Sequence, residues 1–303
     1  MQNDELLIPV TNYDLAATLS SGQAFRWEQC EGRWEGVIGQ YWVRLRQAPE
    51  GVLAQTAVPA TDWRWLTDYL QASLEIDKVL ATFPCDPAMQ ASAAHCQGLR
   101  LLRQEPWECL ASFILSSTKQ IVQIQQIVAL LCQRFGDPVK VPSGHGPVFS
   151  FPSANRLAKT TETELRECKM GFRAPNLLRT ARMVAQGEVD LEQIRKLDLA
   201  EARAELERFP GVGSKIANCV LLFAYGFQGA FPVDVWVMKA LRELYFPRRR
   251  PNKTRLLKFT ATYFGPNAGY AQQYLFHYMR TREKIGISVL NRRGKKREIS
   301  NQR

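Results

Sequence analysis

The sequence Phe209-Pro-Gly-Val-Gly-Ser-Lys215-Ile-Ala-Asn-Cys219, followed by Phe231-Pro-Val-Asp234-Val-Trp236, decides the fold of this chain. A helix-forming sequence with apolar residues three apart precedes the first stretch, and an apolar helical sequence continues from it. Proline ends the first helix and the two glycines permit positive φ, so the pattern predicts two helices joined by a tight hairpin. Bare backbone N–H groups at the start of the second helix would attract a phosphate.

Lys215 stands in the first turn of the second helix, where the helix macrodipole favours an acid. The same positive field, together with partial burial, would lower the pKa of this lysine and leave more free amine, which is a nucleophile. The structural alternative is a solvent-exposed lysine that caps a turn or touches a phosphate. A Walker phosphate loop is excluded, because its Gly-x-x-x-x-Gly-Lys-Ser/Thr pattern is absent.

Asp234 follows Lys215 by 19 residues and precedes a helical sequence. The position predicts an N-cap, in which the carboxylate accepts hydrogen bonds from the first N–H groups of the helix. A capped carboxylate remains fixed and ionised, which also suits it to stabilise a developing positive charge.

These residues resemble the helix-hairpin-helix, Gly/Pro…Asp superfamily of DNA glycosylases. Further motifs make the chain similar to the 8-oxoguanine DNA glycosylase branch, in the order that this family has them and over residues 6 to 282. They are Ser21-Gly-Gln-Ala-Phe-Arg-Trp27, Gly98-Leu-Arg-Leu-Leu-Arg-Gln104, Trp107-Glu-Cys-Leu110, Ser112-Phe-Ile-Leu-Ser-Ser117, Phe151-Pro-Ser153 and Gly171-Phe-Arg-Ala174.

The predicted fold class is α+β. Segments with β-forming residues separated by polar breaks predict an antiparallel sheet in an N-terminal domain over 1–86, and the resemblance implies the same, a TATA-binding-protein-like sheet. An all-α helix-hairpin-helix domain over 87–282 and a basic tail over 283–303 follow. The expected strands are 34–38, 41–46 and 52–58; the expected helices are 14–19, 63–70, 88–96, 107–116, 119–135, 155–160, 162–168, 175–187, 190–194, 199–208, 214–226, 235–244, 253–264 and 268–281, with a Pro/Gly-rich loop at 137–147.

Composition points to a globular protein with a polyanionic partner. The chain has 303 residues, 46% of them hydrophobic, and a formal net charge of +11, with basic clusters at 247–255 and 292–297. It has no apolar run long enough to span a membrane, and its acidic start has no secretory signal. We expect a monomer in a bacterial or archaeal cytoplasm or nucleoid, with a nuclear location as the alternative.

Seven scattered cysteines favour a reducing compartment, and the absence of Cys-x-x-Cys excludes the iron–sulfur cluster of the endonuclease III relatives. His95, His145 and His277 are far apart in the sequence, so no metal site is expected. The resemblance implies that no cofactor is required and that a structural monovalent cation can sit on the hairpin carbonyls.

The resemblance implies roles for the two residues of the opening motif. Lys215 would attack C1′ of the deoxyribose and form a Schiff base, after which β-elimination nicks the strand on the 3′ side. Asp234 would stabilise the cationic sugar and help to position the amine.

The resemblance also implies a pocket that reads a base flipped out of the duplex. The carbonyl of Gly22 would accept N7–H, the donor that 8-oxoguanine has and guanine lacks. Gln272 would read the Watson–Crick edge, Phe276 would stack on the base, and Cys219, one helical turn after Lys215, would line the opposite wall. Plain core packing is the alternative for Phe276 and Cys219.

Contacts with the opposite strand match the family only in part. Phe172 matches an aromatic wedge and Arg173 an arginine that contacts the orphaned cytosine, although both would also suit a turn entering a helix. The family has an asparagine run after Ser116-Ser117 and a second cytosine-reading arginine, where this chain has Thr118-Lys-Gln120 and Gln123. Because bidentate base contacts are lost, we expect a relaxed preference for the opposite base.

Phosphate contacts are expected from the backbone amides of Gly211, Val212 and Gly213, with Lys239 and the arginine cluster as weaker candidates. Trp236 replaces a histidine and Phe223 a methionine of the family, which would reshape the mouth of the pocket.

The sequence is therefore compatible with three candidate functions. A bifunctional 8-oxoguanine glycosylase and apurinic-site lyase explains both Lys215 and the 21–27 motif. A monofunctional glycosylase for alkylated bases shares the fold and Asp234 but lacks the lysine. A non-catalytic duplex-binding module would use the hairpin alone and would be unaffected by loss of either residue.

Overall fold

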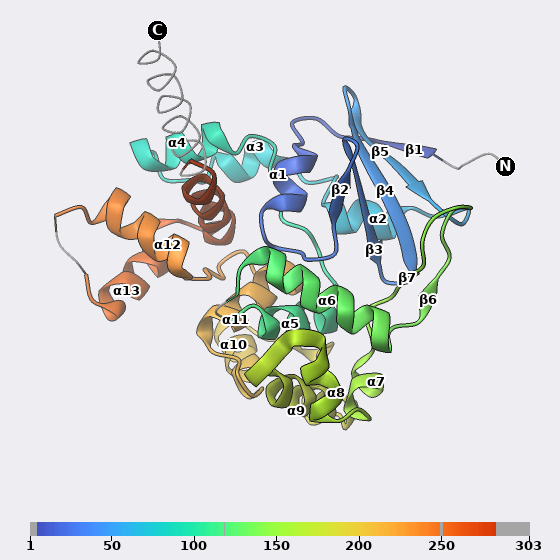
Figure 1. Ribbon diagram of the computed structural model, residues 1–303. Helices are drawn as coiled ribbons and strands as arrows, with labels where there is room; N and C mark the ends of the chain where they lie inside the picture. The colour runs from blue at the N-terminus through green and yellow to red at the C-terminus, as the bar shows by residue number, and fades with distance from the viewer. Residues whose placement is uncertain (1–4, 118, 249–250, 283–303) are drawn as a thin grey trace, which may run out of the picture.

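The computed structural model describes residues 5–117, 119–248 and 251–282. Two lobes lie side by side: an antiparallel sheet with its helices, drawn in blue in Figure 1, and a larger helical lobe drawn from cyan through green to red. The predicted α+β fold class is confirmed. The predicted basic tail lies outside the described residues.

The sheet has five antiparallel strands in the order β1-β5-β4-β3-β2. Buried residues of β4 and β5, such as Val43 and Val52, pack against Leu66 and Leu70 of α2, because one face of the sheet must be covered. The elements of this lobe are β1 (Glu5–Pro9), α1 (Leu15–Ser20), β2 (Glu28–Cys30), β3 (Arg33–Ile38), β4 (Tyr41–Ala48), β5 (Gly51–Thr56) and α2 (Arg64–Leu70).

The helical lobe is built around α5, whose residues are buried apart from Glu108. Its helices are α3 (Ile76–Leu80), α4 (Pro87–His95), α5 (Pro106–Leu115), α6 (Ile121–Phe135), α7 (Ala154–Ala158), α8 (Glu162–Leu165), α9 (Ala174–Ala185), α10 (Leu199–Glu207), α11 (Ser214–Val220), α12 (Val235–Ala240) and α13 (Lys253–Tyr263), and residues 268–282 are helical as well. Wider helical turns extend α11 over Leu221–Tyr225 and α12 over Leu241–Tyr245.

Most predicted helices are present, and the differences have local causes. The helix expected at 190–194 is a short 3-10 turn at Gln193–Lys196, and the one expected over 162–168 ends at Leu165, with Lys169 at φ +62° in the turn that follows. Edge strands β1 and β2 were not predicted, since the first is five residues long and the second only three.

The Pro/Gly-rich segment at 137–147 is not a plain loop. Short strands β6 (Pro138–Val139) and β7 (Val148–Phe149) pair beside the sheet, as Figure 1 shows. Val139 packs against Val37 and Trp42, and Nε2 of His145 lies 2.9 Å from Oε2 of Glu35. The segment therefore joins the helical lobe to the sheet.

A buried glutamine joins the turn after α1 to the helical lobe. The side chain of Gln23 donates to the carbonyl of Arg100 (2.8 Å) and accepts from the N–H of Leu102 (2.8 Å). Gln104 donates to the backbone carbonyl of Gln23, and Gln273 donates to that of Ser21 at 3.1 Å. The turn at residues 20–23 is thus fixed by bonds that span the chain.

The predicted domain boundaries at residues 86 and 282 stay predictions. The core of the sheet lobe ends with α2 apart from Leu102, whereas Ile76 and Val79 of α3 already pack in the helical core.

Among the helices of the described residues, none has the length and hydrophobicity needed to cross a bilayer.

Candidate active site

The hairpin between α10 and α11 has the predicted form, and one of its two glycines has positive φ. Gly211 has φ +77°, and a Cβ there would lie 2.4 Å from Nδ2 of Asn176, so only glycine fits. Gly213 has φ −102° and extended backbone, so the positive φ that both glycines permit is adopted only by Gly211 of the two. The N–H of Val212 donates to the carbonyl of Phe209 at 3.1 Å.

The predicted phosphate contacts of the hairpin therefore depend on Gly211 and Gly213, because Val212 uses its N–H internally. Within the described ranges, no acceptor takes the N–H of either glycine, and no side chain caps the start of α11. Bare N–H groups and the positive end of a helix both favour an anion. This phosphate site stays a prediction.

Lys215 is half-buried rather than solvent-exposed. Its Nζ donates to Oγ of Ser116 at 3.1 Å and lies 5.6 Å from the centre of the Phe113 ring. Ser116, at the end of α5, is itself buried. The amine is thus held by a hydroxyl and an aromatic face.

Asp234 is the N-cap of α12, as the sequence predicts, and its Oδ1 accepts the N–H of Val237 at 2.8 Å. Burial raises the pKa of this carboxyl, and the Val237 hydrogen bond and the charge of Lys215 oppose that rise without cancelling it. Lys215 is thus close enough for its charge to act on the Asp234 carboxyl, which places the two predicted catalytic residues in one site.

Cys219 is buried on the same side of α11 as Lys215. Burial raises the pKa of its thiol to about 11, although the charge of Lys215 acts in the opposite direction. The thiol is therefore neutral at physiological pH, which suits it to line a pocket and not to react.

The predicted base-reading residues come together from the two ends of the chain. Gly22 has φ +77°, and a Cβ there would lie 2.7 Å from Cδ1 of Ile121 and 3.5 Å from Nη1 of Arg280. The Arg280 guanidinium lies over the ring of Phe276, 5.4 Å from its centre. One turn earlier on that helix, Gln272 is buried, and its Oε1 has no partner in the part of the chain that the structure describes.

The predicted wedge and opposite-strand residues differ in their surroundings. Phe172 is 62% exposed, as a side chain that enters a duplex must be. Arg173 is buried beneath it, donates to the carbonyls of Ser117 and Met170, and lies 4.2 Å from the Phe172 ring centre. Contact with an orphaned cytosine requires Arg173 to leave these carbonyls, so that role stays a prediction.

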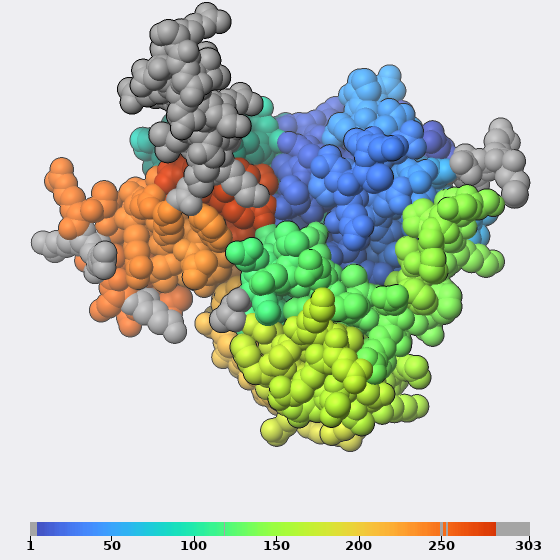
Figure 2. Space-filling model, in the orientation of Figure 1, coloured from blue at the N-terminus to red at the C-terminus, as the bar shows by residue number. Residues whose placement is uncertain are grey.

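Of the two positions that depart from the family, Thr118 and Gln123, the structure describes only Gln123. Oε1 of Gln123 accepts the N–H of Gln120 at 3.1 Å, which caps the first turn of α6. Thr118 lies outside the described residues. Figure 2 shows the start of α6, in green, between the blue sheet lobe and the orange region of α12 and α13.

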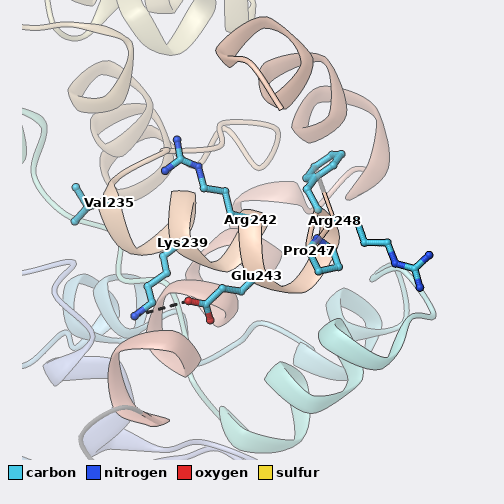
Figure 3. Close-up of a pocket in the computed structure, with 7 residues that line it drawn as sticks. Val235, Lys239, Arg242, Glu243, Pro247 and Arg248 are labelled. Carbon is cyan, nitrogen blue, oxygen red and sulfur yellow. Dashed lines mark ion pairs between the residues drawn. The ribbon is translucent and has the colours of Figure 1, made fainter. Parts of the chain in front are cut away.

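A basic hollow of about 700 Å³ runs along α12 and the helical turn that extends it (Figure 3). Nζ of Lys239 is 3.8 Å from Oε1 of Glu243. Val235, the first residue of α12, is 79% exposed. Three cations against one carboxylate suit a phosphate backbone. The hollow is lined by Val235, Lys239, Arg242, Glu243, Phe246, Pro247 and Arg248.

Three residues of the site were missed from the sequence: Ser116, Ile121 and Arg280. Arg280 had a usable signal, since it follows Phe276 by four residues on a helix. Ser116 and Ile121 had none, because each reaches the site by long-range packing. Within the described ranges, no group of three His, Cys, Asp or Glu residues could hold a metal ion.

Comparison with known proteins gives consistent matches. Residues 5–110 match the family described as 8-oxoguanine DNA glycosylase, N-terminal domain. Residues 111–264 match the HhH-GPD superfamily base excision DNA repair protein.

Two curated relatives and one solved structure are similar over most of the chain. N-glycosylase/DNA lyase OGG1 of Arabidopsis thaliana is 32% identical over 286 residues, covering 88% of this chain and 77% of that protein. A probable N-glycosylase/DNA lyase of Methanothermobacter thermautotrophicus is 30% identical, covering 90% and 95%. The 8-oxoguanine glycosylase/lyase of Clostridium acetobutylicum, in complex with double-stranded DNA containing cytosine opposite 8-oxoguanine, superimposes with a TM-score of 0.85 at 29% identity, covering 93% of this chain and 100% of that one.

Proposed function

Because the chain belongs to the HhH-GPD superfamily of base excision DNA repair proteins, in its 8-oxoguanine glycosylase branch, we propose that it is a bifunctional 8-oxoguanine glycosylase and apurinic-site lyase. The observation that carries the proposal is the pairing of a half-buried Lys215 with Asp234 beside the hairpin. Neither an isolated lysine nor an isolated N-cap would supply both a nucleophile and a stabiliser of positive charge.

The geometry supports a stepwise reaction. The amine of Lys215 attacks C1′ of the extruded nucleotide, and the N-glycosidic bond breaks as the base leaves with the bonding electron pair and takes up a proton. The carboxylate of Asp234 stabilises the positive charge that develops on the sugar. Because Ser116 holds Lys215 through one hydrogen bond, the side chain approaches from a fixed direction.

The covalent intermediate then accounts for strand cleavage. The sugar ring opens and C1′ becomes an iminium (Schiff base) with Nζ of Lys215. This electron sink acidifies the C2′ proton, whose loss expels the 3′ phosphate by β-elimination. Hydrolysis of the remaining imine returns the free lysine.

Recognition is proposed to follow the predicted roles. Phe172 enters the duplex as a wedge, while the extruded base lies between Phe276 and Cys219 and is read by Gly22 and Gln272. Amides of the hairpin and Lys239 in the basic hollow contact phosphates. The protein is proposed to act as a monomer without a required cofactor, on chromosomal DNA in a cytoplasm or nucleoid, and a monovalent cation on the hairpin carbonyls would be structural.

A monofunctional glycosylase for alkylated bases is the second candidate, because it shares the fold and Asp234. Such an enzyme activates water instead of an amine and leaves the strand intact. The position of Lys215 favours the bifunctional reaction.

Borohydride trapping tests the proposal. A duplex with 8-oxoguanine opposite cytosine is incubated with wild type, with Lys215→Gln and with a control at the exposed Lys196, Lys196→Gln. We expect a covalent adduct with wild type and the control, and none with Lys215→Gln. Base release without an adduct in wild type would establish the monofunctional enzyme, and binding without either would leave only a duplex-binding module.

A further inference from the structure

Arg280 lies where the turn after α1 meets the helix over 268–282. Its Nη2 donates to the backbone carbonyl of Ser20, and its Nη1 is 3.5 Å from the point where a Cβ on Gly22 would stand. The guanidinium therefore binds one end of the short segment from Ser20 to Gly22 and lies close to the other end. This segment carries the carbonyl proposed to recognise the oxidised purine.

The same guanidinium lies over Phe276, with Cζ 5.4 Å from the ring centre. Residues four apart on a helix are neighbours on one face, so Gln272, Phe276 and Arg280 form a continuous stripe. A planar cation over an aromatic ring restricts the rotation of both groups. Among the described contacts of these three side chains, the hydrogen bond from Arg280 to the Ser20 carbonyl is the one that reaches the turn after α1.

Arg280 is a weak candidate for a purely structural residue. It is partly buried, its Nε is buried without an acceptor, and no carboxylate of the described ranges lies within ion-pair distance of it. Burial lowers the pKa of this arginine, and the charge of Asp234 acts against that shift. Burying a cation with an unmade hydrogen bond opposes folding, which points to a role other than stability.

We infer that Arg280 is a positioning residue for base recognition: it clamps the turn from Ser20 to Gly22 against Phe276 and so sets the width of the slot that an extruded purine enters. The inference rests on the proposed function, since it assumes that Gly22 and Phe276 receive the base. It assigns no contact between Arg280 and the reacting atoms. The clamp acts on base recognition before the glycosidic bond breaks, and an abasic site has no base for the slot to hold.

The test compares two substrates of the same sequence: a duplex with 8-oxoguanine opposite cytosine, and one with a preformed abasic site at that position. We expect Arg280→Met to lower kcat/KM for 8-oxoguanine release by about tenfold to a hundredfold, the range that follows from losing a hydrogen bond of a charged donor. Nicking of the abasic duplex should be unchanged. Arg280→Lys, which keeps the charge but not the planar stack, should fall between wild type and Arg280→Met.

Arg282 provides a matched control two residues away. It also lies over an aromatic ring, 5.3 Å from the centre of Tyr278, and it pairs with Glu243, but neither contact reaches the turn. Arg282→Met should leave the ratio of 8-oxoguanine release to abasic nicking at its wild-type value. Melting temperatures of all variants show whether a loss of activity reflects loss of fold.

Two results would overturn the inference. Equal losses on both substrates, in Arg280→Met and in a folded Arg280→Lys alike, would show a general structural role. Unchanged release of 8-oxoguanine would show that the turn keeps its place without the clamp. Failure of the proposed function looks different, because the wild type itself would then release no 8-oxoguanine, and the inference would fall with it.

Discussion

The proposed catalytic pair and the proposed base-reading slot are built in opposite ways. Lys215 and Asp234 are 19 residues apart, and each is fixed by the helix that begins beside it. The slot joins Gly22 of the sheet lobe to Phe276 and Arg280 near the other end of the chain. The backbone positions of the proposed catalytic residues are therefore determined locally, whereas the proposed slot depends on how the two lobes dock.

Because the two sites are built differently, substitutions should impair base release and base recognition in different ways. A conservative substitution at the proposed catalytic pair, such as Asp234→Asn, removes a reacting group and keeps a side chain that can cap the helix. A substitution at the slot acts through packing, because the turn at 20–23 is held by side chains such as Gln23 and Gln273. Substrates with and without a base distinguish the two kinds of loss.

The largest effect is expected at Asp234. Asp234→Asn keeps an N-cap side chain and removes only the charge, so the fold is retained while base release falls by roughly a thousandfold or more, as for loss of a catalytic group. Single-turnover release of 8-oxoguanine measures it. Asp198→Asn is the matched control, because Asp198 caps α10 in the same way and takes no part in the proposed chemistry. Equal activity of the two variants would contradict the assignment of Asp234.

The pH dependence of base release tests the same carboxylate. Burial raises the pKa of Asp234 above its ordinary value of 3.8, and the proposed mechanism needs the ionised form. Release should therefore fall as the pH decreases through this raised pKa, and the acid limb should lie above the ordinary aspartate range. A raised carboxyl pKa also means that ionisation opposes folding at neutral pH, so Asp234→Asn should melt at a higher temperature than wild type. A lower melting temperature would show that the carboxylate stabilises the fold.

A smaller effect is expected at the slot. Gly22→Ala places a methyl group 2.7 Å from Cδ1 of Ile121 at φ +77°, and we expect release of 8-oxoguanine to fall by about tenfold or more while abasic nicking persists. Gly39→Ala is matched in backbone strain, at φ +57°, but its methyl group would meet no atom of the described residues within 4 Å. Both variants should lose about 1 kcal/mol of stability, the usual cost of a left-handed alanine. If Gly22→Ala and Gly39→Ala released 8-oxoguanine at the same rate, Gly22 would have no role in base recognition.

The smallest effect concerns the base opposite the lesion. Gln123 caps α6 and cannot form the bidentate contact of an arginine, so excision opposite adenine, guanine or thymine should be within about fivefold of that opposite cytosine, less than one bidentate pair confers. Single-turnover rates on the four duplexes, beside the Arabidopsis relative, measure it. A preference as strict as that of the relative would contradict the prediction that the loss of the second arginine relaxes the choice of opposite base.

Sequence reasoning succeeded where local chemistry decides the structure. Asp234 is the predicted N-cap because a short carboxylate before an apolar helix has one favourable arrangement. Helices such as α5 and α6 begin and end within a few residues of the prediction, since periodicity and Pro/Gly breaks are local signals. It failed at β1, at β2 and at the β6–β7 hairpin, which are short strands that exist only through pairing with partner strands.

The sequence alone was enough to predict the hairpin between two helices, the N-cap at Asp234 and the α+β order of the chain, and it proposed Lys215 and Asp234 as the catalytic pair. Three contacts could be found only in the folded chain: Lys215 donates to Ser116, Arg173 is buried beneath Phe172, and Arg280 donates to the carbonyl of Ser20 in the turn that contains Gly22. The physical reason is the range of the interactions. Helix starts and caps depend on residues within a few positions, whereas a pocket wall depends on which distant surfaces the core brings into contact.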